Sequence, residues 1–347
     1  MIIVVYIVSI VIVGTIFNLL HIPAGWLVGP ILTGVVFKLA FERVFLPDIM
    51  FKIALSLLGV NIGLIMDVHF FLILKDYLTP LFICLVITIV GALLIGKFLF
   101  RFTDLDRITA FFCCIPGGAS EAIALSKDYG ANQQIVAAFH STRIVLFVLV
   151  VPFIISTFFS LEVNRNTIID FSHFHLLDVF VILILCAIAI VVSNRFKIPA
   201  GALLYSMILG FILNNFIFSI PTPPQLLTVL GQVLIGGYIG LRFTKESLFQ
   251  LKRIGPISVF SILCLFIISL IVSLFFTMFT STNYLVSILS LVPAGAGEMA
   301  SIAYSLHLDA SLVTTIQIAR LVIVFLLIPR VASYLLKKIV VSENKIG

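Results

Sequence analysis

The chain has 347 residues, of which 62% are hydrophobic and only 10% carry a charge. A soluble domain has about 25% charged residues, so this composition excludes a water-soluble protein and predicts a multi-pass membrane protein. The net charge of +6 does not indicate a nucleic-acid partner, because basic residues beside membrane spans set orientation and no polar stretch is long enough for a DNA-binding domain.

Apolar segments of the length that crosses about 30 Å of hydrocarbon recur along the chain. The first begins at Met1 without a basic n-region or a cleavage site, so we expect a retained helix rather than a signal peptide. The predicted spans are 2–20, 24–41, 49–66, 78–100 and 132–159, followed by 176–194, 198–218, 225–241, 255–279 and 310–336. Two broken apolar segments, 108–128 and 285–306, each precede the last span of one half.

The two broken segments are copies of one pattern. The first reads Pro116-Gly117-Gly118-Ala119-Ser120-Glu121, and the second reads Pro293-Ala294-Gly295-Ala296-Gly297-Glu298, at an offset of 177 residues. The same offset relates Asn132 to Asp309, His140 to Gln317 and Arg143 to Arg320. We therefore predict a first transmembrane repeat at 1–160, an external linker at 161–175 and a second transmembrane repeat at 176–347.

Basic residues are grouped in alternate loops, and the grouping moves by one loop between the halves. They follow the second and fourth spans of the first half, and the first and third spans of the second half. Under the positive-inside rule, this pattern predicts a cell-membrane protein with cytoplasmic N- and C-termini and two halves of opposite orientation.

This orientation also constrains the broken segments. Residue 107 would be internal and the 161–175 linker external, so segment 108–128 must enter and leave the membrane on one side. The same reasoning makes 285–306 a re-entrant hairpin. The predicted fold is all-α, with two inverted repeats of five transmembrane helices plus one re-entrant hairpin each, an architecture typical of secondary transporters. The competing arrangement has twelve full crossings in two parallel halves.

The hairpins carry the candidate site. Proline stops the incoming helix, glycines allow the turn, and a second short helix begins near Ser120 or Gly297 with unpaired N–H groups that favour anions. Glu121 and Glu298 lie in its first turn. On the next span, His140 and Arg143, and likewise Gln317 and Arg320, are three residues apart and share one face.

Two interpretations of these charges stay open, and both can hold. In one, Arg143 and Arg320 clamp a substrate anion while Glu121 and Glu298 bind a proton or cation. In the other, each Glu pairs with the Arg of its own copy and fixes the hairpin to the neighbouring span. The candidate binding residues are Pro116, Gly117, Gly118, Ser120, Glu121, His140, Arg143, Pro293, Gly295, Gly297, Glu298, Gln317 and Arg320.

Weaker signals accompany this site. Gly59 and Gly63 align with Gly236 and Gly240 and predict close helix packing. Secondary candidate residues for the site are Asn61, Asn132, Tyr238 and Asp309. Pro23-Ala24-Gly25 and Pro199-Ala200-Gly201 predict the starts of the second spans. No motif for a metal, a cofactor or a catalytic centre occurs, so we expect none of these and no enzymatic activity.

The duplicated P-x-G-x-x-E…R pattern, together with I-P-A-G blocks at 22–25 and 198–201, resembles the AbrB-duplication membrane family. The resemblance covers nearly the whole chain, although the first copy has Ala122 where the second has Met299. Members are often labelled ammonia monooxygenase or AbrB-family regulator, so the resemblance implies oxygenase chemistry or regulation of gene expression. The residues support neither, because no cluster of His and carboxylate suits a redox metal and no small β-rich DNA-binding domain is visible.

The sequence therefore predicts a secondary transporter for a small anionic or zwitterionic solute, coupled to protons or a cation. The alternative is a membrane-embedded sensor or regulator, as the family label suggests, and a membrane monooxygenase is disfavoured. The expected partners are the lipid bilayer and a small-molecule solute but no nucleic acid, and a homodimer is compatible with the sequence.

Overall fold

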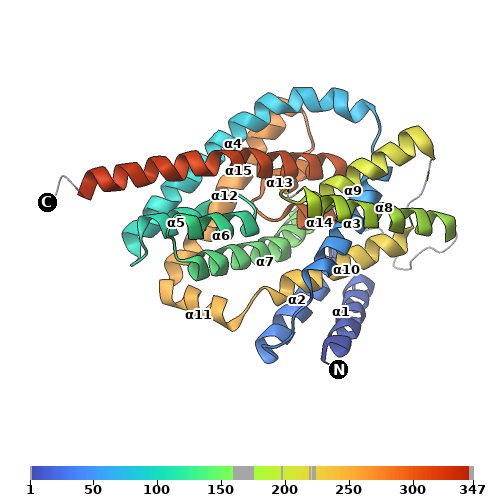
Figure 1. Cartoon of the computed structure of the whole chain (residues 1–347), viewed down its shortest axis with the longest axis horizontal. Helices are drawn as coiled ribbons and strands as arrows, with labels where there is room; N and C mark the ends of the chain where they lie inside the picture. Colours follow the sequence, from blue (N-terminus) through green and yellow to red (C-terminus); the bar gives the residue numbers. More distant parts are fainter. Residues whose placement is uncertain (1, 159–175, 197, 219, 221–223, 344–347) are drawn as a thin grey trace.

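The fold was analysed in a computed structural model that describes residues 2–158, 176–196, 198–218, 220 and 224–343 (Figure 1). Within these ranges every regular element is helical. The first half comprises α1 (Ile2–Leu19), α2 (Gly25–Ala40), α3 (Asp48–Leu64), α4 (His69–Phe102), α5 (Arg107–Cys114), α6 (Ala119–Asp128) and α7 (Gln133–Phe158). The second comprises α8 (Leu176–Arg195), α9 (Gly201–Ile212), the π-helical turn η1 (Leu213–Ile217), α10 (Gln225–Leu241), α11 (Lys245–Ile254), α12 (Pro256–Thr280), α13 (Tyr284–Leu291), α14 (Ala296–Ser305) and α15 (Ala310–Glu343).

The longest helices have the composition of membrane spans. Among the described residues, five are long and apolar enough to cross a membrane, in α1, α4, α7, α8 and α12, or six if α10 and the start of α11 form one span bent by 52°. Shorter apolar helices lie at Gly25–Ala40, Gly201–Ile217 and Ala310–Val324. All ten predicted spans coincide with helices and both broken segments are helix pairs, which fits a membrane protein. The predicted linker at 161–175 lies outside the described residues.

One pair of corresponding segments differs. The predicted span 78–100 lies within a continuous helix of 34 residues, α4, whereas span 255–279 is preceded by a separate helix, α11. Gly255 causes the break, because its φ of 80° is accessible to glycine and Pro256 then starts a new helix. The corresponding residue of the first half is Leu78, which continues α4.

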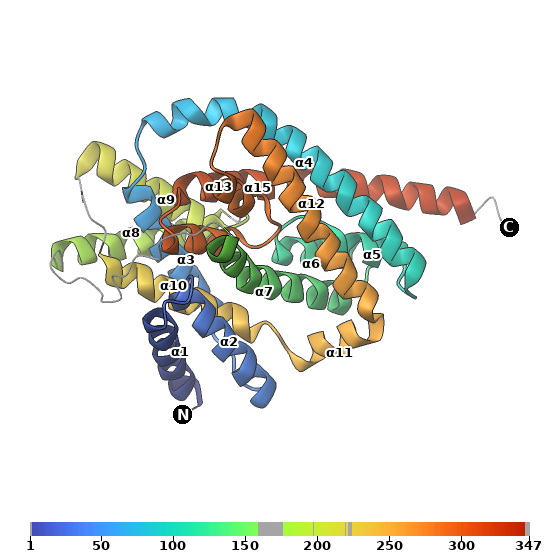
Figure 2. The same cartoon turned by 180° about the vertical axis from the view of Figure 1, so that it is seen from behind.

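Helices from both halves mix in two groups. The first, which we call the scaffold bundle, contains α1, α2, α3, α8, α9 and α10, and its main contacts join α3 to α9 and α2 to α10 (Figure 1). The second, the hairpin bundle, contains α4–α7 and α11–α15, with α4 packed along α12 (Figure 2). The bundles meet where α7, α14 and α15 contact α2, α3 and α10.

The glycine pairs confirm the predicted close packing. A Cβ on Gly59 would come within 2.5 Å of the Leu203 carbonyl oxygen, and one on Gly63 would collide with the carbonyl of Met207, so α3 lies directly on α9 and runs in the same direction. Gly236 and Gly240 lie in the same way against the carbonyls of Leu27 and Ile31 on α2.

The second spans begin where the Pro-Ala-Gly blocks predict. Ala24 and Ala200 precede α2 and α9 in the left-handed conformation, with φ of 52° and 53°. Gly25 follows because a Cβ there would lie 2.7 Å from the backbone nitrogen of Asn18. A tight reversal of the chain therefore separates each first span from the second.

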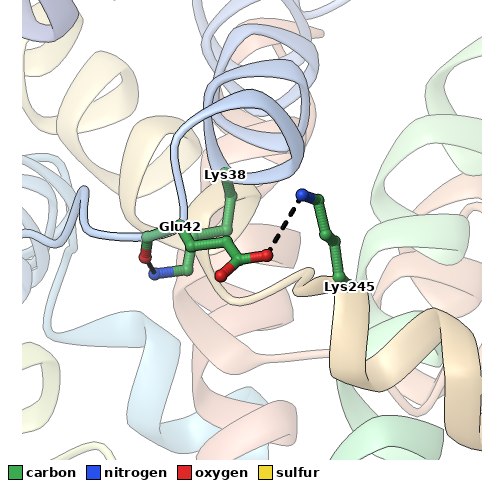
Figure 3. A network of polar contacts seen from close by, with 3 residues as sticks. All are labelled: Lys38, Glu42 and Lys245. Carbon is green, nitrogen blue, oxygen red and sulfur yellow. Dashed lines mark hydrogen bonds and ion pairs between the residues drawn. The ribbon is translucent and has the colours of Figure 1, made fainter.

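Several basic loops gather at one end of the molecule. The Nζ of Lys245, at the start of α11, lies 3.1 Å from Glu42 Oε1 in the loop after α2 (Figure 3). Lys38 fixes the same loop by donating to the carbonyls of Glu42 at 2.7 Å and Val44 at 2.9 Å. Lys52 near the start of α3 donates to Asn194 Oδ1 in the last turn of α8 at 2.5 Å. Three loops that the charge pattern predicts on one side of a membrane are thus neighbours.

Candidate functional site

Each broken segment forms two short helices that meet at a proline-containing turn. In the second copy, α13 ends at Leu291 and α14 begins at Ala296 after the extended residue Gly295. In the first copy, α5 ends at Cys114 and α6 begins at Ala119 after Gly118, which has the same extended conformation. The N-cap residues of α6 and α14 are the glycines Gly118 and Gly295, so neither second helix is capped by the side chain of its N-cap residue.

Arg320 ties the second hairpin to α15. Its Nη1 donates to the carbonyls of Leu291 at 2.8 Å and Val292 at 2.9 Å, and its Nη2 donates to Ala294 at 3.3 Å. These carbonyls lie at the C-terminal end of α13 and in the turn, where a positive charge is favourable. Gln317 supports the clamp by accepting from Arg320 Nη2 at 2.5 Å and donating to the Leu289 carbonyl at 2.6 Å.

Arg143 makes the corresponding clamp in the first hairpin. Its Nη1 donates to the Ile115 carbonyl at 2.8 Å, and its Nη2 donates to Gly117 at 3.3 Å. His140 takes the place of Gln317: its Nδ1 lies 3.0 Å from Arg143 Nη2, and its Nε2 lies 2.8 Å from the Phe112 carbonyl. This geometry assigns the neutral Nε2–H tautomer, because Nδ1 must accept and Nε2 must donate.

The clamps replace the predicted ion pair in the second copy. Glu298 and Arg320 form no salt bridge, and the salt bridge found among the described residues joins Lys245 to Glu42 instead. Backbone carbonyls hold the arginine because the last turn of a helix presents several oxygens that one guanidinium can reach. The side chains of Ser120 and Glu121 lie outside the described part of the structure.

A buried arginine gives each hairpin turn a positive centre. Arg143 and Arg320 are completely or almost completely buried, at 0% and 1% exposure. The Nε of each is buried without a hydrogen-bond partner. Two buried cations that keep an unused donor, beside two uncapped helix starts, make an environment suited to an anion.

Glu298 adds a buried carboxylate to this centre. It is 5% exposed and occupies the third position of α14, where a carboxylate interacts well with the start of a helix. The side chain folds back over Gly295, where any Cβ would collide with its carboxylate oxygens. Gly295 is therefore needed for the path of the Glu298 side chain as well as for the turn.

The secondary candidates lie apart from the hairpin turns. Asp309 accepts from the Leu312 N–H at 2.9 Å, and Asn132 accepts from Gln134 at 3.1 Å and Ile135 at 3.2 Å, so both begin the helices that carry the arginines. Asn61 is buried in α3, where its Nδ2 donates to the Leu57 carbonyl at 2.9 Å and its Oδ1 has no partner.

Sequence reasoning missed polar residues where the bundles meet. Gln232 of α10 is 3% exposed and donates to Ser305 Oγ at 2.9 Å, which joins the scaffold bundle to α14. Arg242, a basic residue after the third span of the second half, lies over the rings of Phe51 and Tyr238, a contact that the charge pattern did not predict. The sequence signal that could have found these residues is a polar side chain within or beside an apolar segment.

The fold and the site together define the class of protein: an apolar, all-helical chain of the membrane-protein type, with two broken helices around buried charges. The chain belongs to the AbrB family, because the family model described as "Transition state regulatory protein AbrB" matches residues 1–68 and 26–336. It is 26% identical over 322 residues to "Putative regulator AbrB" of Escherichia coli (strain K12), covering 92% of each chain. It is 29% identical over 346 residues to "Uncharacterized protein YhjN" of Bacillus subtilis (strain 168), covering 91% of this chain and 88% of that protein.

Proposed function

We propose that the protein is a secondary transporter for a small anionic or zwitterionic solute, with no catalytic step of its own. The observation that carries the proposal is the pair of buried arginines at the two hairpin turns. Both arginines are buried, and neither pairs with a described carboxylate. A solute with one negative group would balance this buried positive charge and could use the free Nε–H donors.

The proposed architecture is two inverted repeats, each with five transmembrane helices and one re-entrant hairpin, in the cell membrane with cytoplasmic termini. Its support comes from helix directions. α3 runs parallel to α9, and α10 runs parallel to α2. Ala54 of α3 lies against Gly231 of α10, and Asp48 at the start of α3 contacts Tyr238 near the end of α10, so the corresponding helices α3 and α10 run in opposite directions. The basic loops gathered at one end would then face the cytoplasm.

Alternating access would arise from movement of the hairpin bundle against the scaffold bundle. The hairpin bundle is suited to move as a unit because the arginine clamps hold each hairpin to α7 or α15 through several hydrogen bonds. Glu298, at the edge of that bundle, is the proposed ligand for the coupling proton or cation. Its carboxylate is the buried acid closest in sequence to the second turn.

The test is charge movement in proteoliposomes that contain the purified protein. Small carboxylates, amino acids and inorganic anions are applied at two pH values, and thermal unfolding is recorded with the same solutes. We expect one solute class to produce a current that is lost in Glu298→Gln. Asp104→Asn, which removes an exposed carboxylate, is the matched control and should transport normally. If no solute produces a current or changes the unfolding temperature, the proposal is wrong.

A second candidate function is a membrane-embedded sensor that regulates gene expression. The observation in its favour is the name of the Escherichia coli relative, "Putative regulator AbrB". This function would need a cytoplasmic partner, because the described loops are short. Purification of the tagged protein from its native membrane should then yield a partner at a fixed ratio, and the ratio should change when solute is added.

A further inference from the structure

The helices α3 and α10 pack along a line of side-chain contacts, here called the seam, that runs from one end of the molecule towards the second hairpin. Along α3 the side chains become more buried, from exposed Asp48 through half-buried Phe51 to Leu55, which is 7% exposed. Leu55 touches the start of α14, because a Cβ on Gly297 would collide with Leu55 Cδ2. Phe51 and Leu55 are one turn apart on one face, so the seam ends beside Glu298.

Three side chains close this seam at its outer end. The rings of Phe51 and Tyr238 stack with centroids 4.4 Å apart, and the Tyr238 hydroxyl donates to Asp48 Oδ1 at 2.5 Å. The Arg242 guanidinium lies over both rings, 4.9 Å from the centroid of Tyr238 and 5.5 Å from that of Phe51. Its Nη2 also donates to the Tyr238 hydroxyl at 3.4 Å.

Arg242 gives this closure a positive charge, and the contacts behind it end at α14, which carries the buried carboxylate of Glu298. Arg320, which belongs to the same copy as Glu298, is held by carbonyls of its hairpin. The closure thus belongs to the scaffold bundle, whereas the carboxylate behind it belongs to the hairpin bundle.

The closure is present at one end only. At the repeat offset, Tyr238, Arg242 and Phe51 correspond to Asn61, Ile65 and Thr228, which provide no aromatic stack and no charge. Asn61 Oδ1 and Thr228 Oγ1 are instead buried without partners. The two ends of the molecule thus offer different chemistry to a solute.

We propose that Phe51, Tyr238 and Arg242 form a gated entrance to Glu298 from the end that carries the basic loops, and that Arg242 makes this entrance selective for anions. The aromatic pair supplies the barrier, and the cation supplies the selectivity, since a fixed positive charge concentrates anions at a narrow opening. The inference rests on the proposed function, because an entrance matters only if a solute enters.

The test measures access to a reporter cysteine behind the entrance. Leu55→Cys is placed in a variant whose five native cysteines are replaced, and the folded state is checked by thermal unfolding. The reporter is modified with 2-sulfonatoethyl methanethiosulfonate, an anion, and with its trimethylammonium analogue, a cation of similar size. If Leu55→Cys does not fold, Ser301→Cys is the second reporter, because it is nearly isosteric and lies one turn from Glu298 on α14.

We expect the anionic reagent to react faster, and Arg242→Gln to lower the anion-to-cation rate ratio about tenfold, the scale expected of one fixed charge a few ångströms from the path. Arg242→Lys should keep the ratio, and Arg101→Gln, which removes an exposed arginine elsewhere, should leave it unchanged. Tyr238→Ala should raise both rates without changing their ratio.

An unchanged ratio in Arg242→Gln would overturn the selectivity, and unchanged rates in Tyr238→Ala would overturn the gate. The labelling needs no transported solute, so its failure is distinct from failure of the proposed transport. If a solute produces a current but the reporter cysteine does not react, this entrance alone is refuted. If labelling is selective but no solute produces a current, transport alone is refuted.

Discussion

The two hairpins hold the same arrangement with different side chains. In both copies an arginine on the following helix donates to carbonyls at the turn, yet its helper residue is His140 in one copy and Gln317 in the other. The two helpers are equivalent because each offers one acceptor to the arginine and one donor to a carbonyl one turn before the break. The comparison teaches that the clamp depends on the positions of donors and acceptors, and not on charge at the helper.

Removal of the clamp arginine should produce the largest loss of unfolding free energy. Arg320→Ala removes three hydrogen bonds to carbonyls, although the Val292 carbonyl still accepts from Gln317 Nε2 at 3.2 Å. We expect a loss of unfolding free energy above about 4 kcal/mol, whereas Arg143→Ala, which removes two such bonds, should lose less. Thermal unfolding in detergent measures both. Arg101→Ala is the control at an exposed position. A smaller loss for Arg320→Ala than for Arg143→Ala would show that the number of these bonds does not set the strength of the clamp.

A second test addresses the glycines that position the scaffold bundle in both halves. Gly63→Ala and Gly240→Ala place a methyl group against carbonyls of α9 and α2, and each should cost about 3 kcal/mol of unfolding free energy. Gly96→Ala is the matched control, because its Cβ would meet its nearest heavy atom at an ordinary 3.4 Å. Equal unfolding temperatures for all three variants would show that the helices can separate at no cost.

Exchange of the helpers sharpens the comparison further. His140→Gln should stay within about 1 kcal/mol of the parent, whereas His140→Leu should lose about 2 kcal/mol because the Phe112 carbonyl is left unpaired. Gln317→His should be tolerated as well as His140→Gln. Unfolding curves at neutral pH check all three variants, and a leucine variant as stable as the glutamine variant would disprove the role of the hydrogen bonds.

The smallest effect is expected at the loops. The Lys245–Glu42 pair is exposed, with side chains 56% and 68% accessible, so Glu42→Gln should change the unfolding free energy by less than about 1 kcal/mol (Figure 3). The change should vanish at 1 M salt, where exposed charges are screened. A large loss that persists in high salt would mean that this contact, which has no counterpart in the first half, holds the bundles together.

Much of the helical framework could be predicted from the sequence. Apolar length located the spans, and the paired prolines and glycines located the hairpin turns and the close contacts of α3 and α10. The partners of the arginines could not be predicted, because residue spacing shows which side chains share a face but not which distant backbone groups they meet. A carboxylate at equal spacing in both copies left an ion pair open as one of two interpretations, whereas helix-end carbonyls, which carry no sequence signal, hold Arg320.

The helix α11 illustrates a second limit. Its residues were interpreted as a basic loop, since Lys245, Lys252 and Arg253 dominate its charge pattern. The apolar residues between them lie at helical spacing, and the Thr244 hydroxyl begins the helix by accepting from the Ser247 N–H at 3.1 Å. Short amphipathic helices of this kind are difficult to recognise in the sequence, because the basic residues that indicate topology obscure the helical spacing of the apolar residues.

The clamps have a consequence for how the two copies can change over time. The clamps contact main-chain oxygens, so the residues that supply these oxygens can differ between the copies. Arg143 and Arg320 bond Ile115 and Val292, and Gly117 and Ala294. Their helpers His140 and Gln317 bond Phe112 and Leu289. A mutation at these positions leaves the bonded oxygen in place. Each turn can therefore carry its own side chains while the geometry of the clamp is kept, so the two hairpins can present different surface chemistry on the same framework.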